Sequence, residues 1–402
     1  MNQRELFLKH VAQTSDTPFS GIDMNVRSAQ GSVLTDVNGK EYIDLISGIS
    51  VSNIGHCHPA VVKAIQEQSQ KFMHLMVYGE FNQSPQVVYA TSLCKHLPSS
   101  LNSVYFTTGG SEAVEGALKL AKRATGRTEL ISFKNAYHGS THGALSMMGD
   151  EFFKNSFRPL LPDVKHLEFN NISGLNEITK RTAAIIIEPV QGEAGVTKAD
   201  LAFIKKLRER CNETGTLLIF DEIQTGFGRT GTLFAFEQYM IVPDILLIAK
   251  GMGGGLPIGA FIASQTLTSK LTVDPVLGHI NTFGGNAVSV AAAQATLEII
   301  TEEKLYLSAA RIEKQIREKL KHPLIKELRI VGALGAIDFK DETLNMKVIK
   351  SCIEAGVITD WFLFCSTAMR IAPPLNIEQN LLDKAIINIL TVLDRHSEPL
   401  RV

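Results

Sequence analysis

The sequence lacks several features that would place it in a specialised class of protein. It has only 5 cysteines in 402 residues, with no C-x-x-C pair, so neither a disulfide framework nor a zinc site is expected. Its 40 basic and 41 acidic residues give a net charge of -1, which predicts no nucleic-acid or acidic-lipid partner. No apolar run approaches the roughly 20 residues of a membrane span, so no membrane association is predicted.

What remains is the composition of an ordinary globular protein. Hydrophobic residues make up 45% and charged residues 20%, and the length suffices for two domains. Residues 1–10 contain acid and no apolar signal-peptide core, so we expect a cytoplasmic protein. His56-Cys57-His58 is the one cluster that suggests a metal, but it has no distant partners at ligand spacing. We interpret it as a turn before Pro59 and predict no metal.

Short apolar runs alternate with helical patterns along the middle of the chain. The runs expected to form strands are 104–107, 128–133, 183–187, 217–220, 245–248 and 258–263. Such alternation predicts an α/β fold with a mainly parallel sheet flanked by helices. Near the N-terminus, Asn38-Gly39 between two alternating runs predicts a β-hairpin over 31–45.

We expect two domains. The large one takes residues 51–290, and a smaller α+β domain combines residues 1–50 with residues 291–402. Strands of the C-terminal part are expected near 328–339 and 368–372, after helices from about 285 to 320.

Two of the expected buried strands end in a charged residue. The run that begins at Thr216 ends in Asp221, and the run that begins at Asp244 ends in Lys250, before Gly251-Met-Gly-Gly-Gly. Both side chains should therefore reach the edge of the sheet. A lysine and an aspartate presented in this way suit a pyridoxal phosphate enzyme. The amine forms the Schiff base, and the carboxylate keeps the pyridine nitrogen protonated.

A glycine-rich turn supplies a candidate phosphate site. Thr107-Thr-Gly-Gly-Ser111 follows an expected strand and precedes a helical pattern over 112–122. Gly110 lets the backbone approach an anion, Ser111 adds a hydroxyl, and the helix N-terminus adds unpaired amides. It is not a Walker loop, because no Gly-Lys-Ser/Thr follows. Taken alone, the segment is explained equally well as a plain turn.

Three further residues are placed to contact the cofactor ring. Tyr137 follows a strand and can stack on one face, Ile223 can pack on the other, and Gln224 can hydrogen-bond the 3-hydroxyl oxygen. Each has an ordinary structural explanation by itself, as a core aromatic or a residue near a cap. The phosphate turn, the acid and the lysine in this order favour the cofactor site.

The order and the amino-acid sequences of these segments resemble those of the class III pyridoxal-phosphate aminotransferases of fold type I. That group includes the ornithine, acetylornithine and 4-aminobutyrate aminotransferases, and the similarity is greatest to the acetylornithine and ornithine enzymes. The resemblance spans nearly the whole chain. The matching segments are 48–59, 108–113, 188–193, 221–231, 249–255, 282–286 and 369–375.

The resemblance implies a role for each cofactor contact. It makes Lys250 the catalytic Schiff-base lysine and Asp221 the partner of the ring nitrogen, and it includes Glu188 in the cofactor-binding set. The contacts of Gly110, Ser111, Tyr137, Ile223 and Gln224 are those already described. Thr282 completes the phosphate site from a neighbouring subunit, which implies a homodimer with shared active sites.

The resemblance also implies how the substrate binds. Arg370 holds an α-carboxylate bidentately, and Glu193 is its gate, pairing with the arginine when an ω-amine must avoid it. The ornithine and acetylornithine enzymes usually carry an arginine where this chain has Ser140, and the ornithine type a tyrosine where it has Ile49. Both departures bear on how glutamate, 2-oxoglutarate and ornithine would be held.

We therefore expect a ping-pong transaminase. It should move an amino group from a terminal amine, such as that of N-acetylornithine or a related ω-amino acid, to 2-oxoglutarate or pyruvate. The nearer alternative is an aminomutase, lyase or racemase on the same scaffold. A dinucleotide-binding oxidoreductase is more remote, because no glycine fingerprint opens a first βαβ unit. A cofactor-binding regulator without catalysis is a third alternative.

Overall fold

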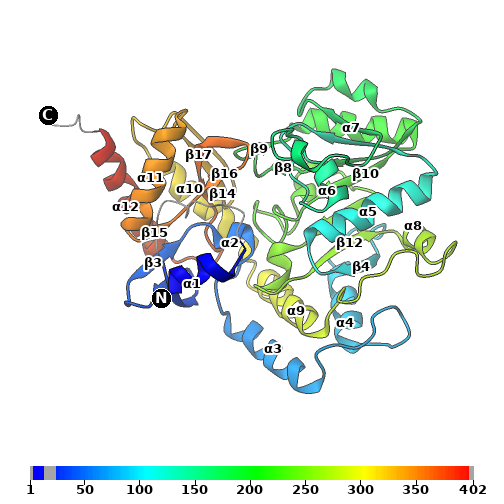
Figure 1. Cartoon of the computed structure of the whole chain (residues 1–402), viewed down its shortest axis with the longest axis horizontal. Helices are drawn as coiled ribbons and strands as arrows, with labels where there is room; N and C mark the ends of the chain where they lie inside the picture. The colour runs from blue at the N-terminus through cyan, green and yellow to red at the C-terminus, as the bar shows by residue number, and fades with distance from the viewer. Residues whose placement is uncertain (1–2, 13–23, 398–402) are drawn as a thin grey trace.

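The computed structural model describes residues 3–12 and 24–397. Parts of the expected terminal segments, residues 1–2, 13–23 and 398–402, lie outside the described residues. Figure 1 shows two lobes, one with β3, α11 and α12 and the other with β4, β10, α5 and α7.

The largest sheet in the described part of the chain has seven strands in the order β4-β12-β11-β10-β7-β5-β6. Neighbours pair in parallel from β11 to β6, whereas β12 is antiparallel to both β11 and β4. The strands are β4 (Ser103–Thr107), β5 (Glu129–Phe133), β6 (Val164–Leu167), β7 (Thr182–Ile187), β10 (Leu217–Asp221), β11 (Ile245–Ile248) and β12 (Gly259–Ala263). The α/β class with a mainly parallel sheet is confirmed, and β6 is a strand that the sequence did not predict.

The central strands are apolar throughout because helices cover both faces of the sheet. Successive side chains of a strand point to opposite faces. In β10, Ile219 belongs to the buried cluster of α5 (Gly110–Thr125), whereas Leu218 and Phe220 belong to the cluster of α7 (Leu201–Thr214). Because β10 and its neighbour β11 are buried on both faces, the polar side chains Asp221 and Lys250 lie where these strands end.

The remaining helices surround the two lobes. Helices α3 and α4 pack on α9, and α11 packs on α12. The bounds are α1 (Gln3–His10), α2 (Ser47–Ser50), α3 (Pro59–Lys71), α4 (Ser84–Cys94), α6 (His142–Ser146), α8 (Gln265–Thr268), α9 (Ala287–Glu302), α10 (Ser308–Lys319), α11 (Glu342–Glu354) and α12 (Gln379–Ser397). Within the described residues, no helix has the length and apolar character that crossing a bilayer requires.

Two smaller sheets form the other lobe. One has the order β13-β14-β17-β16, with β13 (Glu327–Val331), β14 (Leu334–Asp338), β16 (Trp361–Phe362) and β17 (Cys365–Ile371). The other has the order β1-β2-β3-β15, with β1 (Val26–Gln30), β2 (Val33–Asp36), β3 (Glu41–Asp44) and β15 (Val357–Ile358).

The second of these sheets joins the two ends of the chain. Strands β2 and β3 form the predicted hairpin, with Gly39 in the left-handed region at φ +84°. Strand β3 then pairs in parallel with β15 from the C-terminal part. The pairing supports a small domain built from both termini, whereas the boundaries at residues 50 and 290 stay a prediction.

A short hairpin lies between the lobes, beside β16 and β17 (Figure 1). It consists of β8 (Val190–Gln191) and β9 (Thr197–Lys198), paired antiparallel. Its loop, residues 192–196, includes Glu193.

Candidate active site

A cavity of about 410 Å³ lies at the carboxyl ends of the parallel strands of the large sheet. Its walls come from the segments that follow β4, β5, β7, β10 and β11, which is where ligands bind in open α/β sheets. Eight of the cofactor-binding residues predicted from the sequence line it, namely Gly110, Ser111, Tyr137, Glu188, Asp221, Ile223, Gln224 and Lys250.

Lys250 is the first residue of a 3₁₀ turn, Lys250–Gly253, that directly follows β11 and the single residue Ala249. Its φ of +45° is unusual for a side chain with a Cβ, and such backbone strain is typical of functional sites. Burial lowers the pKa of the Lys250 amine, while the charge of Glu193 opposes the shift. The lowered pKa makes the neutral, nucleophilic amine more accessible at physiological pH.

Asp221 is held by two contacts. Its Oδ2 lies 2.7 Å from Nδ1 of His138, and its Oδ1 accepts a hydrogen bond of 3.0 Å from the backbone N–H of Ile223. Both side chains are buried, and Nε2 of His138 has no hydrogen-bond partner among the described residues. The histidine fixes the orientation of the carboxylate toward the cavity.

Glu188 ties two parts of the site together. Its Oε1 accepts from the backbone N–H of Tyr137 at 2.9 Å, and its Oε2 accepts from that of Gly192 at 3.2 Å. Burial raises the pKa of this carboxyl to about 7, and the charge of Asp221 adds to the rise. Glu188 therefore positions both Tyr137 and the start of the β8–β9 loop.

The turn before α5 suits an anion. The N-cap residue of α5 is Gly109, which has no side chain to cap the helix, and Gly109, Gly110 and Ser111 all line the cavity. A Cβ on Gly139 would lie 2.3 Å from Oγ of Ser111, so only glycine permits this close approach. The nearby carboxylate of Glu112 is engaged elsewhere, by Thr108 and Asn281. The turn thus offers hydrogen-bond donors to a phosphate.

Gln224 and Ile223 complete the cavity wall. Nε2 of Gln224 is buried and has no hydrogen-bond partner among the described residues, although the side chain lines the cavity. A Cβ built on Gly110 would meet Cδ1 of Ile223 at 2.9 Å, so Ile223 packs directly against the phosphate turn. An unpaired amide beside an apolar wall fits a flat ring with a polar edge.

Arg370 and Glu193 form a bidentate ion pair next to the cavity. The two oxygens of Glu193 lie 2.9 and 3.0 Å from Nη1 and Nη2 of Arg370. Nε of Arg370 donates to Asp360 Oδ1 at 2.9 Å, and the guanidinium lies 4.5 Å from the centre of the Phe362 ring. Although burial would raise the pKa of Glu193, the arginine holds it below its ordinary value. Gly192, the neighbour of Glu193 in the chain, adjoins the cavity wall: its N–H donates to Glu188, and a Cβ on it would lie 1.7 Å from Oε1 of Gln224.

Four predicted residues lie outside the cavity lining: Glu193 and Arg370, described above, and Ser140 and Thr282. Ser140 is exposed, and its Oγ lies 3.1 Å from the hydroxyl of Tyr137. Thr282 is also exposed; its Oγ1 lies 3.2 Å from the hydroxyl of Tyr78, and it lines a neighbouring hollow. A single chain therefore does not bring Thr282 to its own cavity, and its role in a partner's site stays a prediction.

The sequence did not single out His138 or Asp360. The only signal for His138 was its place between Tyr137 and Gly139 in a segment already chosen. Asp360 precedes β16 and carried no signal, because its partner Arg370 belongs to another strand.

A lysine and a carboxylate at the ends of adjacent strands, an anion-binding turn and an unpaired amide define the site of a pyridoxal-phosphate-dependent enzyme of fold type I. The chain belongs to the class-III aminotransferase family, whose sequence profile matches residues 14–393. The predicted class, the cofactor pyridoxal phosphate and the transaminase activity are confirmed. An amino donor and a 2-oxo acid are the substrates of such an enzyme.

Curated relatives agree with this assignment. The chain is 37% identical to an acetylornithine aminotransferase of Methanopyrus kandleri, over 98% of this chain and 99% of that protein. It is 38% identical to an acetylornithine aminotransferase of Archaeoglobus fulgidus, over 94% of this chain and 96% of that protein.

Solved structures agree as well. A transaminase from a marine Virgibacillus aligns with a TM-score of 0.90 and 29% identity, covering 98% of this chain and 99% of that chain. The ornithine aminotransferase of Toxoplasma gondii, described with partial occupancy of pyridoxal phosphate at its active site, has a TM-score of 0.89 and 29% identity over 98% and 95% of the two chains.

Proposed function

We propose that the amino donor is the terminal amine of N-acetylornithine or a related ω-amino acid, and that the acceptor is 2-oxoglutarate or pyruvate. The observation that carries this proposal is the bidentate pair between Arg370 and Glu193, whose loop adjoins the cavity wall. The acetylornithine aminotransferases among the relatives support it.

In this proposal each residue of the cavity binds a different part of the cofactor. Pyridoxal phosphate, when bound, supplies an aldehyde carbon that amines attack and a ring that withdraws electrons. The Ser111 hydroxyl and the first amides of α5 bind its phosphate. Asp221, oriented by His138, pairs with the ring nitrogen, and Gln224 donates to the 3-hydroxyl oxygen. Tyr137 and Ile223 enclose the ring and exclude water.

Lys250 carries out the proton transfer. Its Nζ, with a lowered pKa, would take a proton from the substrate carbon as a general base and deliver it, as a general acid, to the aldehyde carbon of the cofactor. The same amine holds the cofactor between turnovers. The product formed from the donor leaves before the acceptor enters the same cavity, which gives ping-pong kinetics.

Glu193 lets one pocket accept two kinds of substrate. While it pairs with Arg370, the guanidinium is neutralised, and an ω-amine enters without its carboxylate being drawn to the arginine. When Glu193 moves away, Arg370 is free to bind an α-carboxylate through two parallel hydrogen bonds. Asp360 keeps Nε of Arg370 in place in either state.

We also propose a homodimer in which Thr282 reaches the partner's phosphate site. Segments 73–87 and 277–286 adjoin, through a hydrogen bond of 2.7 Å from Gln86 to the Gly285 carbonyl and one of 3.0 Å from Asn286 to the Met73 carbonyl. Together they expose a group of large apolar side chains: Met73, Leu75, Met76, Phe81, Val87, Leu277, Ile280 and Phe283. An apolar patch of this kind is typical of an interface between subunits. A cytoplasmic location remains part of the same proposal.

A donor panel tests the proposal. N-acetylornithine, ornithine and 4-aminobutyrate would each be paired with 2-oxoglutarate and with pyruvate, and kcat/KM measured for each pair. N-acetylornithine should give the highest value among the donors. An absence of turnover with both N-acetylornithine and 4-aminobutyrate, whose only free amines are terminal, would refute the proposed donor class.

A further inference from the structure

The loop that carries Glu193 is contacted by the four-stranded sheet β13-β14-β17-β16. At one point, the backbone N–H of Phe364 donates to the Glu193 carbonyl at 3.0 Å, and that of Leu363 donates to Glu193 Oε2 at 3.1 Å. These two residues form the turn between β16 and β17. At a second point, two residues further along the loop, a charged side chain makes the contact.

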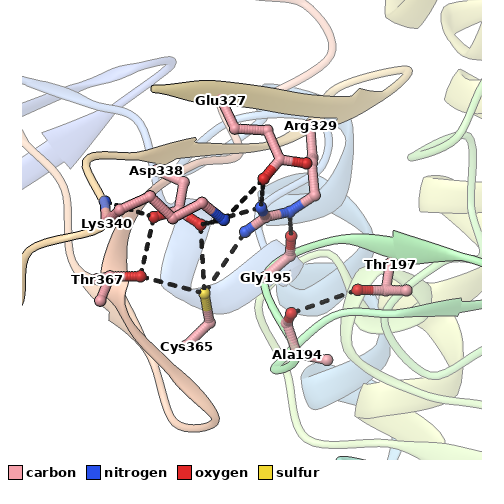
Figure 2. A network of polar contacts seen from close by, with 9 residues as sticks. All are labelled: Ala194, Gly195, Thr197, Glu327, Arg329, Asp338, Lys340, Cys365 and Thr367. Carbon is pink, nitrogen blue, oxygen red and sulfur yellow. Dashed lines mark hydrogen bonds and ion pairs between the residues drawn. The ribbon is translucent and has the colours of Figure 1, made fainter. Parts of the chain in front are cut away.

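That side chain is Arg329, in β13 (Figure 2). Its Nε donates to the carbonyl of Gly195 at 2.6 Å, while its Nη1 lies 2.7 Å from Glu327 Oε2 and 3.0 Å from Asp338 Oδ2. Lys340 reaches the same two carboxylates, at 2.8 and 2.7 Å, from the side away from the loop. The guanidinium is thus fixed by its own sheet before it meets Gly195.

Arg329 and Cys365 pack so closely against Gly195 that no side chain would fit there. A Cβ on Gly195 would lie 2.7 Å from Nη2 of Arg329 and 2.9 Å from Sγ of Cys365. Gly195 lies at φ +77°, and the buried Val196 lies at +62°, a region that a β-branched residue rarely adopts. Because the loop adopts an unfavourable backbone, its shape depends on contacts such as that of Arg329.

We propose that Arg329 is a positioning residue for substrate selection: by holding the Gly195 carbonyl, it keeps the loop where Glu193 covers Arg370. The inference rests on the proposed gate role of Glu193. Arg329 touches neither cofactor nor substrate and acts through Glu193. Weakening its hold shifts the loop toward the open position, which favours α-carboxylate substrates over ω-amines.

The geometry calls for arginine at this position. A guanidinium presents Nε and Nη1 in a fixed fork, so one rigid group reaches the loop and the carboxylates at once. A lysine preserves the positive charge beside Asp338 and Glu327 but has a single nitrogen for both directions. Arg329→Lys therefore keeps the positive charge in the sheet but weakens the hydrogen bond to the Gly195 carbonyl.

The test compares the two half-reactions of the holoenzyme in stopped flow. For each variant, kcat/KM for N-acetylornithine and kcat/KM for 2-oxoglutarate give one ratio of acceptor to donor efficiency. Arg329→Lys and Arg329→Met should raise this ratio about 5-fold, as expected for the loss of one hydrogen bond to the loop. A loss of folded enzyme would lower both efficiencies equally and leave the ratio unchanged.

Lys340→Met is the matched control, because it removes the other cation of the same carboxylates without touching the loop. Its ratio should stay within about twofold of the wild-type value. Glu193→Gln is the benchmark for the gate and should shift the ratio in the same direction as the Arg329 variants.

Three outcomes would overturn the inference. If Glu193→Gln shifts the ratio and both Arg329 variants leave it unchanged, the gate exists but Arg329 does not position it. If Lys340→Met shifts the ratio as much as Arg329→Lys does, the charge of the network is responsible and the loop contact is not. If Glu193→Gln has no effect, the gate itself is refuted, and with it the proposed function of the pair.

Discussion

His138 Nδ1 lies 2.7 Å from Asp221 Oδ2, and both side chains are buried. The pair sits at the end of β10, one strand away from Lys250. Asp221, the proposed partner of the cofactor's ring nitrogen, is thus oriented by a histidine from the segment that follows β5. Changing the histidine should disturb the orientation of Asp221 without removing its carboxylate.

His138→Ala should lower kcat about tenfold, because one hydrogen bond to a buried charge contributes about 1.5 kcal/mol. Steady-state kinetics at saturating pyridoxal phosphate would measure the change. The dissociation constant of the cofactor should rise less than kcat falls. A kcat equal to that of the wild type would show that His138 has no part in orienting Asp221.

Ser140→Arg should improve the binding of 2-oxoglutarate relative to pyruvate. A guanidinium at this position, beside the hydroxyl of Tyr137, would pair with the second carboxylate of the dicarboxylic acid. The ratio of KM for pyruvate to KM for 2-oxoglutarate should rise about tenfold, equivalent to about 1.4 kcal/mol. Ser140→Gln, which is long but uncharged, is the control and should change the ratio little. Equal effects of the two variants would rule out a charge-based clamp.

Ile280→Glu should separate the subunits and reduce activity. Ile280 is 50% exposed within the proposed apolar interface, and a buried unpaired carboxylate there opposes association. Sedimentation velocity would measure the oligomeric state. Ile387→Glu in α12, at a position 61% exposed and away from that patch, is the control and should leave the assembly intact. A dimer that persists in Ile280→Glu would place the interface elsewhere.

Glu222 should make the stability depend on pH. Burial raises its pKa to about 7 in the folded protein, although the backbone N–H groups of Ala235 and Phe236 donate to its carboxylate. A carboxyl with a raised pKa binds more protons folded than unfolded. Its contribution to stability is therefore full below the unfolded pKa, near 4.5, and is lost as the pH rises through about 7.

Denaturant unfolding of the wild type and of Glu222→Gln, at pH 5 and at pH 8, would measure this contribution. The wild type should lose on the order of 2–3 kcal/mol more than the variant between the two values. Glu222→Gln is expected to be less stable at both, since an amide replaces one of the two acceptor oxygens. Parallel pH profiles for the two proteins would show that Glu222 titrates as an ordinary carboxyl.

The sequence predicted those parts of the molecule in which a local pattern decides the structure. Strands β7, β10 and β11 are apolar because they are buried on both faces, and Asp221 and Lys250 stand out because they are charges that follow such runs. Strand β6 was missed because Val164-Lys-His-Leu is short and half polar.

Contacts between segments far apart in the chain could not be predicted from the sequence. His138 and Asp221 are 83 positions apart, and Gly195 and Arg329 are 134 apart. No spacing rule links such residues, since their proximity depends on the order of the strands and on how the small sheet meets the β8–β9 loop.

The most direct measurement is to locate the bond between the protein and its cofactor. Purified enzyme would be incubated with pyridoxal phosphate, reduced with borohydride, digested and mapped by mass spectrometry, with Lys250→Ala as the control. The wild type should turn yellow and carry the reduced pyridoxyl group on Lys250 in stoichiometric amount, and the variant should carry none there and show almost no turnover. A label on a different lysine, or full activity in Lys250→Ala, would contradict the assignment of this site.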